Sequence, residues 1–296
     1  MRSIAAAMWL AGWASFGTAL AAAPDCAGPP PQLALEKITA RAIVVGEVHG
    51  NEQTPQFVAQ LVCGLLKQGR TVILALEREG QEQAALNRYL SSAGNPSDVK
   101  ALTGTGAWAR PFQDGRNSQA MLALIEQMRQ WKQAGQRVGV LAMQLEFHEI
   151  IAADPGQPMQ LTEIESTRFA AINDRTMADK LWMTLASSPA YTVVALAGNW
   201  HTAVGSKSRA ELVPTPSLAD VLASYVPIHV IGLKSAGGTH WIATPDGKAG
   251  PRPSIAGPLY LQDSRIDSEV DIGNVTASPP AASLARPQPG AERGPD

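Results

Sequence analysis

Residues 42–49 read Ala42-Ile43-Val44-Val45-Gly46-Glu47-Val48-His49, an apolar run that ends on a glycine and leads into an acid and a histidine. A similar order returns in Val193-Val194-Ala195-Leu196-Ala197-Gly198-Asn199-Trp200-His201, and the run Thr71-Val72-Ile73-Leu74-Ala75-Leu76 ends on Glu77. Short apolar runs are typical of buried parallel strands, and ligands bind at the carboxyl edge of such sheets. We therefore expect two histidines and two glutamates to meet in one cleft.

Helical patterns alternate with these runs along the chain. The expected elements are a strand at 41–46, a helix at 52–67, a strand at 71–77, a helix at 81–90, a long loop at 91–116, a helix from 117, a strand at 137–143, a helix at 162–186, a strand at 192–197, a helix at 214–225, a strand at 228–233 and a hairpin around 237–242. This alternation favours a three-layer α/β domain with a mostly parallel central sheet and helices on both faces.

The α/β domain is expected at 38–265, and three other segments flank it. Arg2 precedes an apolar, alanine-rich run that ends in a small-x-small cleavage site, so we assign 1–21 to a secretory signal peptide. The alternative is a single membrane anchor, for which the run is short. An N-terminal arm follows at 22–37, and the Pro- and Ala-rich tail at 266–296 is expected to be disordered. The expected location is periplasmic or secreted, with no stable membrane insertion after cleavage.

Composition and missing motifs exclude several classes of function. The chain has 296 residues, 45% of them hydrophobic, so it can bury a full core. Its formal charge is −2, and loss of Arg2 leaves 23 basic against 26 acidic residues, or −3, so we expect no nucleic-acid partner. No Gly-x-Ser-x-Gly elbow, P-loop or Gly-x-Gly-x-x-Gly turn is present, which disfavours a serine nucleophile and a nucleotide cofactor.

Two cysteines occur, and both lie after the expected cleavage site. In an oxidising compartment Cys26 and Cys63 could form a disulfide that closes a loop of about 37 residues and stabilises the fold. Two free thiols are the alternative, with Cys63 buried in a helix face. We favour the disulfide.

The spacing of Glu47 and His49 suits acid–base chemistry. Residues i and i+2 of a strand face the same side, so both can point into the cleft. A carboxylate beside an imidazole raises its basicity and selects its tautomer, as a general base requires. We predict that His49, Glu47, Glu77 and His201 are catalytic, and His49, Glu77 and His201 could instead bind a divalent metal. Alternatively, His49 only caps the next helix and Glu47 pairs with a local arginine.

Charged residues of the long loop and of the helix at 162–186 are further candidates. Arg110 and Arg116 stand near Trp108 in a cluster that could hold an anionic ligand or only close the domain edge. Asp174 and Arg175 could reach the cleft or form a solvated helix face. We name Arg110, Arg116, Asp174 and Arg175 as candidate substrate-binding residues.

The remaining candidates are weaker. Glu77 could lie in an exposed charged turn, although its place directly after an apolar run favours the cleft. His148 follows a strand and could reach the cleft, whereas His229 lies within a strand and is expected to be structural. For His240 the sequence favours neither role.

These motifs resemble those of the superfamily that joins TraB/Tiki proteins, erythromycin esterases and ChaN-type haem-uptake proteins. The resemblance rests on Gly46, Glu47, His49, Glu77, Gly198 and His201. It covers 38–233, and the stretches 75–90, 174–178 and 197–201 are most similar to the ChaN branch. Related sequences tend to place an arginine where this chain has Asn173.

The resemblance implies a shared site but not a shared activity. Esterase members use histidine and glutamate to activate water, Tiki members resemble metal-dependent peptidases, and ChaN members are associated with haem. A role that depends on the missing arginine at Asn173 would need a substitute, for which Arg175 and Arg168 are the candidates.

Our leading hypothesis is an exported hydrolase, esterase- or metallopeptidase-like, that acts on a small-molecule or peptide substrate. In it His49 is the base, Glu47 and Glu77 orient it or bind metal, and His201 lies on the opposite wall. The rival is a haem- or iron-binding protein with an axial Tyr, His or Met, and a third option is an interaction protein with a degenerate cleft. The tyrosine candidates for a haem ligand are Tyr89, Tyr191, Tyr225 and Tyr260. The sequence makes no prediction of oligomeric state.

Overall fold

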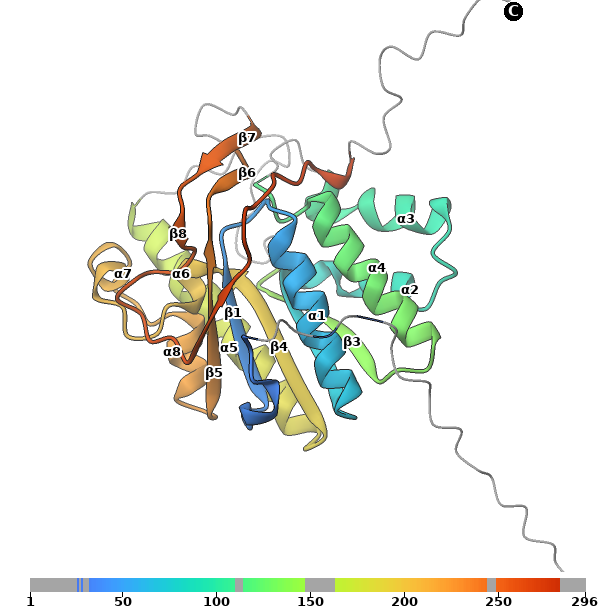
Figure 1. Cartoon of the computed structure of the whole chain (residues 1–296), viewed down its shortest axis with the longest axis horizontal. Helices are drawn as coiled ribbons and strands as arrows, with labels where there is room; N and C mark the ends of the chain where they lie inside the picture. Colours follow the sequence, from blue (N-terminus) through green and yellow to red (C-terminus); the bar gives the residue numbers. More distant parts are fainter. Residues whose placement is uncertain are drawn as a thin grey trace, which may run out of the picture.

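A seven-stranded sheet runs through the centre of the chain, in the order β3-β2-β4-β1-β5-β8, with β9 also paired to β5 (Figure 1). The computed structural model describes residues 26, 28, 32–109, 114–146, 163–243 and 249–282. The sheet strands are β1 (Ala42–Glu47), β2 (Thr71–Glu79), β3 (Val138–Gln144), β4 (Tyr191–Gly198), β5 (Ile228–Ser235), β8 (Gly257–Pro258) and β9 (Ser268–Asp271). Each pair is parallel except β5–β8. The predicted α/β class with a mostly parallel central sheet is confirmed.

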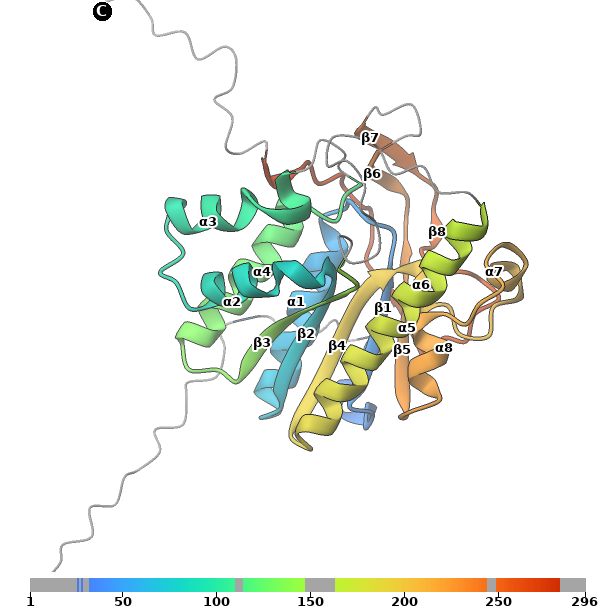
Figure 2. The ribbon, with the colours of Figure 1, turned by 180° about the vertical axis from the view of Figure 1, so that it is seen from behind.

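Helices cover both faces of this sheet (Figures 1 and 2). They are η1 (Leu35–Lys37), α1 (Gln53–Lys67), η2 (Gly80–Glu82), α2 (Gln83–Leu90), α3 (Pro96–Thr103), η3 (Gly106–Ala109), α4 (Gln119–Gln133), α5 (Glu163–Ser187), α6 (Asn199–Thr202), α7 (Lys207–Leu212) and α8 (Leu218–Ala223). Neighbouring strand residues point to opposite faces, so Ile43 packs with Leu61 of α1 while Val44 packs with Leu181 of α5. Two apolar cores on one sheet make the predicted three-layer arrangement.

The register of the parallel strands brings their polar ends to one edge. Glu47 of β1 lies opposite Gly198 of β4, and Leu76 of β2 lies opposite Leu196 of β4. The residues that follow these positions therefore leave the sheet at the same edge, which is the condition for a shared cleft.

The loop predicted at 91–116 contains a helix, α3, followed by the turn η3. Asn95 caps α3: its side chain accepts hydrogen bonds from the backbone N–H groups of Ser97 and Asp98, and the Asp98 carboxylate accepts one from the Asn95 N–H. Pro96 occupies the first turn, where its missing N–H costs nothing. The Gly, Pro and Ser content that predicted a loop is in part the capping sequence of a short helix.

The prediction of a disordered tail from residue 266 is wrong for 266–282. Strand β9 pairs in parallel with residues 231–234 of β5, and Val270 and Val275 are buried. A short edge strand is held by backbone hydrogen bonds and needs few large apolar side chains, so its composition does not reveal it. A hairpin is present, but it is not centred on Gly237-Gly238 as expected: β6 (Gly238–Ala243) pairs antiparallel with the strand that follows it, β7 (Ala249–Ser254), so these glycines lie at the start of the hairpin. Residues 283–296 lie outside the described part.

The N-terminal arm is tied to the first helix. Cys26 and Cys63 are joined as a disulfide with their Cα atoms 6.4 Å apart, and Cys63 lies in the middle of α1. Leu33 and Leu35 of the arm are buried in the same core. The expected signal peptide at 1–21 lies outside the described residues, and no helix within them is long and apolar enough to cross a bilayer.

Candidate active site

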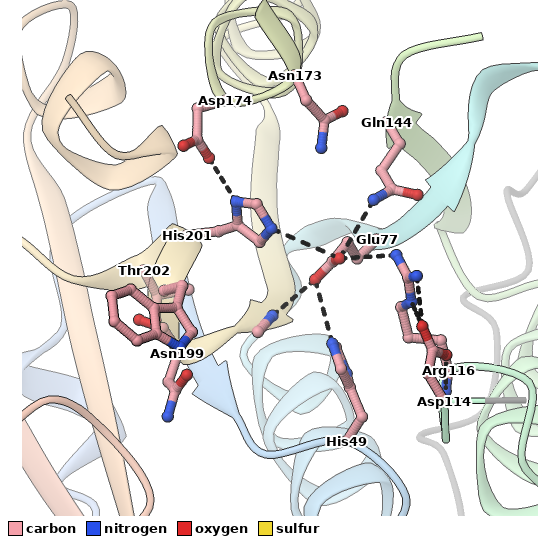
Figure 3. Close-up of polar contacts among 12 residues, drawn as sticks. His49, Glu77, Asp114, Arg116, Gln144, Asn173, Asp174, Asn199, His201 and Thr202 are labelled. Carbon is pink, nitrogen blue, oxygen red and sulfur yellow. Dashed lines mark hydrogen bonds and ion pairs between the residues drawn. The ribbon is translucent and has the colours of Figure 1, made fainter. Parts of the chain in front are cut away.

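The carboxyl edge of the sheet carries a cluster of ionisable side chains around Glu77 (Figure 3). Glu77 lies near the end of β2, and Glu47 and His49 come from the end of β1 and the turn after it. His201 lies in the short helix α6, which directly follows β4, and Asp174 approaches from α5. The structure thus brings together all four residues predicted to be catalytic.

Glu77 is the centre of the cluster, and both its oxygens accept hydrogen bonds. Oε2 accepts one from the backbone N–H of Gly198 at 2.7 Å, and Oε1 accepts from Arg116 Nη1 at 2.9 Å and from Gln144 Nε2 at 3.2 Å. Burial alone would raise the pKa of Glu77, but His201, His49 and Arg116 outweigh it and lower the pKa to about 2. Glu77 is therefore ionised at neutral pH.

His49 is held between two carboxylates. Its Nδ1 lies 2.9 Å from Glu47 Oε1, and its Nε2 lies 3.6 Å from Glu77 Oε2. Burial would lower the pKa of His49, but the charges of Glu47 and Glu77 and the hydrogen bond that Nδ1 donates to Glu47 raise the pKa to about 9. At neutral pH the ring is an imidazolium, and it becomes a base only as the pH approaches this value.

The variant Glu47→Gln is expected to lower the pKa of His49 from about 9 toward the ordinary value of 6.5, because the amide keeps the shape of Glu47 but removes its charge. Titration of the His49 ring proton by NMR measures the change. Glu36→Gln, at an exposed position in the N-terminal arm, is the matched control and should leave the pKa of His49 unaltered. A pKa of His49 that stays the same in Glu47→Gln would contradict the assignment.

His201 forms a second pair of the same kind. Its Nδ1 lies 2.5 Å from Asp174 Oδ1, and its Nε2 lies 3.6 Å from Glu77 Oε1. Asp174 Oδ2 accepts a hydrogen bond from Arg209 Nη2 at 2.7 Å. Burial opposes the charged ring, yet Glu77 and Asp174 raise the pKa of His201 above its ordinary value. Asp174 is fully buried with both oxygens engaged, so it orients His201, and the predicted contact with substrate is corrected.

Glycine at position 198 leaves room for the His49 ring beside Glu77. A Cβ at Gly198 would lie 3.1 Å from Nε2 of His49 and 3.4 Å from Oε2 of Glu77. The absent side chain also lets the Gly198 N–H reach Glu77. The glycine of the second motif is thus explained by close approach of the backbone to the site.

Of the other predicted substrate-binding residues, one lies in the site, one lies at the surface and one lies outside the described residues. Arg116 lies in the site, where it bonds Glu77 and also Asp114, through Nε at 2.8 Å. Arg175 does not, since its side chain is 62% exposed and pairs with Asp179 one turn along α5. It is therefore the solvated helix charge that the sequence left as an alternative. Arg110 lies outside the described residues.

Of the two other described histidines, His240 borders the cluster: burial lowers its pKa, while a hydrogen bond with the backbone of His49 and the charge of Glu47 oppose this shift. His229 Nε2 lies 2.9 Å from Ser268 Oγ on β9, which agrees with the structural role expected for it. His240 is buried, with its Nε2 2.8 Å from Ser254 Oγ across the hairpin. His148 lies outside the described residues.

Two residues of the site were missed by sequence reasoning. Gln144 directly follows the run predicted as a strand at 137–143, so the rule that drew attention to Glu77 could have found it too. Arg209 carried no such signal, because it lies 35 residues from Asp174 in a short helix. Asn173 accepts a hydrogen bond from the Leu145 N–H and stands beside Gln144 and His201 (Figure 3). The arginine that binds Asp174 is Arg209, not Arg175 or the exposed Arg168.

The predicted divalent metal does not fit this donor set. Both oxygens of Glu77 already accept hydrogen bonds, and the Arg116 guanidinium places a positive charge where a cation would bind. Within the described ranges, no group of three or more His, Cys, Asp or Glu side chains is arranged to hold a metal ion. We derive no step through a metal.

A polar cavity of about 70 Å³ lies against Glu77 and Arg116. A single water needs roughly 10–15 Å³ measured in this way, so the cavity has room for several. Its other lining residues include Glu79, Glu82, Asp114 and Gln144. Oε1 of the buried Glu82 has no protein partner, which is the kind of atom that an internal water satisfies. This cavity has space for water on the Arg116 side of Glu77, and neither His49 nor His201 lines it.

Comparison with known proteins finds solved structures that share the fold of this chain at low sequence identity. No family model matches the sequence, and no curated protein matches it either. A succinoglycan biosynthesis protein of known structure is similar over 81% of this chain and 89% of its own, with 11% identity and a TM-score of 0.57. A mutant of the erythromycin esterase EreC in its open conformation is similar over 74% and 76%, with 11% identity and a TM-score of 0.53.

A structure of ChaN from Campylobacter jejuni with cofacially bound haem also matches, over 67% of this chain and 83% of its own, at 18% identity. Its TM-score of 0.40 is too low to support an argument. The erythromycin esterase belongs to one of the groups of proteins that the sequence motifs resemble. These likenesses concern the fold, and the site must be argued from its own geometry.

Proposed function

We propose that the chain is a hydrolase, esterase- or peptidase-like, that activates water without a metal. One observation carries the proposal: two histidines, each with its Nδ1 held by a carboxylate, direct their Nε2 atoms at the two oxygens of Glu77, 3.6 Å away on each side. Histidine held by a carboxylate is a recurrent arrangement of general acids and bases. The same fold occurs in an erythromycin esterase.

His49 acts as the base in this proposal. The neutral ring takes a proton from water at Nε2, while Glu47 holds the proton on Nδ1. The water oxygen bonds to the carbonyl carbon of the substrate while the π electrons of the carbonyl move to its oxygen. When this oxyanion collapses, the bond between the carbon and the leaving group breaks, and His49 returns the proton to the leaving group. Because the pKa of His49 is about 9, only about one ring in a hundred is neutral at pH 7, so the rate should rise with pH up to that value.

Two cations can stabilise the charge that develops on the carbonyl oxygen. Glu77 and Asp174 raise the pKa of His201 and so favour the charged form of its ring, and Nε2 is the nitrogen that faces the centre of the site. The Arg116 side chain is 31% exposed, so part of its guanidinium remains accessible. Donors fixed in this way by Asp174 and Asp114 need little reorganisation during the reaction, which is how such groups lower the barrier.

The substrate is proposed to be a small molecule or a peptide. His49 and His201 are each about one-fifth exposed, so a ligand can reach their rings without a change in the core. Trp200 directly precedes His201 and is 40% exposed, which offers an apolar surface at the edge of the site. Export to the periplasm or the medium is part of the proposal, and the Cys26–Cys63 bond supports it because disulfides persist in oxidising compartments.

Haem binding is the second candidate. The observation that favours it is the exposed Trp200 beside a histidine whose Nδ1 is held by Asp174, since axial histidines are commonly oriented by a hydrogen-bonded carboxylate. The hydroxyls of Tyr89 and Tyr225 donate to Glu126 and Asp179, and that of Tyr260 donates to Glu269. These bonds make His201 the first ligand to test.

The two candidates are separated by experiments on the same sample of residues 22–296. Hydrolysis of a panel of esters and peptides, measured at pH 7 and pH 9 with EDTA present, is expected to be faster at pH 9. A haemin titration followed at the Soret band is expected to give no saturable one-to-one complex. Saturable haemin binding that His201→Ala abolishes, together with no hydrolysis of the panel, would overturn the hydrolase in favour of haem binding.

A further inference from the structure

Arg209 of α7 is buried next to Asp174, the partner of His201, and all three nitrogens of its guanidinium donate hydrogen bonds. Nη2 donates to Asp174 Oδ2 at 2.7 Å, and Nε donates to the backbone carbonyl of Trp200 at 2.7 Å. Nη1 donates to the backbone carbonyls of Val213 and Thr215. The residue is 4% exposed, so these contacts replace its hydration completely.

Two of these contacts act on His201 from different directions. Asp174 holds the ring of His201 at Nδ1, and Trp200 is the residue immediately before His201 in α6. Arg209 therefore binds both the carboxylate that orients the ring and the backbone that carries it. A planar guanidinium can do this because its donors diverge in a fixed fork, which a lysine ammonium cannot reproduce.

We propose that Arg209 is a positioning residue for His201: it joins α5, α6 and α7 so that Nε2 of His201 points at Glu77. This deepens the proposed hydrolase, on which its catalytic consequence rests. Asp174 would otherwise be a fully buried carboxylate with a single partner, free to rotate with the ring that it holds. Because Arg209 holds Oδ2 of Asp174, the carboxylate cannot rotate, and Oδ1 stays in place to bind Nδ1 of His201.

The charges around His201 define a readout that does not require a substrate. They are Glu77 on β2, Asp174 on α5, His49 after β1 and Arg209 on α7. Loss of the Arg209 charge leaves Asp174 less neutralised, so the pKa of His201 should rise further. Arg209→Lys keeps the positive charge but loses the diverging donors of the guanidinium. It should therefore leave the pKa of His201 close to the wild-type value but allow the His201 ring to rotate.

The test compares Arg209→Met and Arg209→Lys with the wild type, and Arg175→Met is the matched control. Arg175 also pairs with a carboxylate of α5, but at the surface and away from the site. Titration of the His201 ring by NMR is expected to give a higher pKa in Arg209→Met than in the wild type, and nearly the wild-type pKa in Arg209→Lys. The downfield Nδ1–H signal that Asp174 protects should be seen in wild type and Arg175→Met and be lost in both Arg209 variants.

With a hydrolysed substrate in hand, both Arg209 variants should lose about 10-fold or more in kcat with KM within about twofold, and Lys should not rescue. A protected Nδ1–H signal and an unshifted pKa of His201 in both variants would overturn the proposal, whether or not a substrate is known. Rescue of kcat by Lys would overturn the positioning role in favour of charge alone. If the panel shows no hydrolysis, the proposed function fails, but the NMR comparison still decides the role of Arg209.

Discussion

His49→Ala is expected to lower kcat/KM for any hydrolysed substrate by about a thousandfold, the range in which loss of a general base falls. The His49 ring is hydrogen-bonded to Glu47 through Nδ1, and its Nε2 is the proton acceptor in the proposed reaction. Its removal leaves Glu77 and His201 in place, with space where the base had been. The effect should lie in kcat, because the ring is proposed to act in the transition state and not in binding.

The control for this variant is His229→Ala. His229 lies opposite Ile43 near the start of β1, at the other end of the sheet, and contacts Ser268. Initial rates at pH 9 should be near wild type for His229→Ala and near background for His49→Ala. Equal rates for wild type and His49→Ala, with both folded by circular dichroism, would remove His49 from the mechanism.

Asp174→Ala is expected to lower the free energy of unfolding by about 3–5 kcal/mol, as is typical when one partner of a buried ion pair is deleted. Asp174 is fully buried and binds both Arg209 and His201. The variant leaves the Arg209 guanidinium in the interior without its carboxylate, and the cost of an unpaired buried charge far exceeds that of a lost surface pair. Urea unfolding followed by tryptophan fluorescence measures the change.

Asp179→Ala is the matched control, because Asp179 lies on the same helix and pairs with Arg175 in an exposed position. Its unfolding midpoint should stay close to that of the wild type. If Asp174→Ala and Asp179→Ala destabilise equally, the buried network is not the support that the structure indicates. His201 should also lose the raised pKa that it owes in part to Asp174, and titrate nearer 6.5.

The edge of the sheet and its four predicted catalytic residues could be read from the sequence because each residue lies within four positions of the end of a short apolar run. The run 71–76 is short and rich in β-branched residues, which favours a buried strand, and the residue after such a strand leaves the sheet at its carboxyl edge. Parallel pairing then brings 47 and 198 side by side without any knowledge of loops. Local pattern and one rule of topology were sufficient here.

Contacts between distant helices could not be read in this way. Asp174 reaches Arg209 only because α5 extends past the end of the sheet to α7, and neither helix records the other in its own pattern (Figure 2). On α5, the neighbouring Asp174 and Arg175 are equally polar in sequence, yet one is fully buried and the other exposed. Which of the two side chains faces the interior depends on the rotation of α5 about its axis. The packing of α5 against the rest of the fold determines this rotation.

The most direct test of the account is the rate of ester and peptide hydrolysis at pH 9 by the wild type beside Glu77→Gln. Glu77 is the one side chain that both histidines face, and the amide keeps its size while removing the charge that orients and polarises the two rings. The account predicts hydrolysis by the wild type and a rate at least about 100-fold lower in Glu77→Gln. Equal rates in the two proteins, or no hydrolysis by the wild type on either class of substrate, would contradict it.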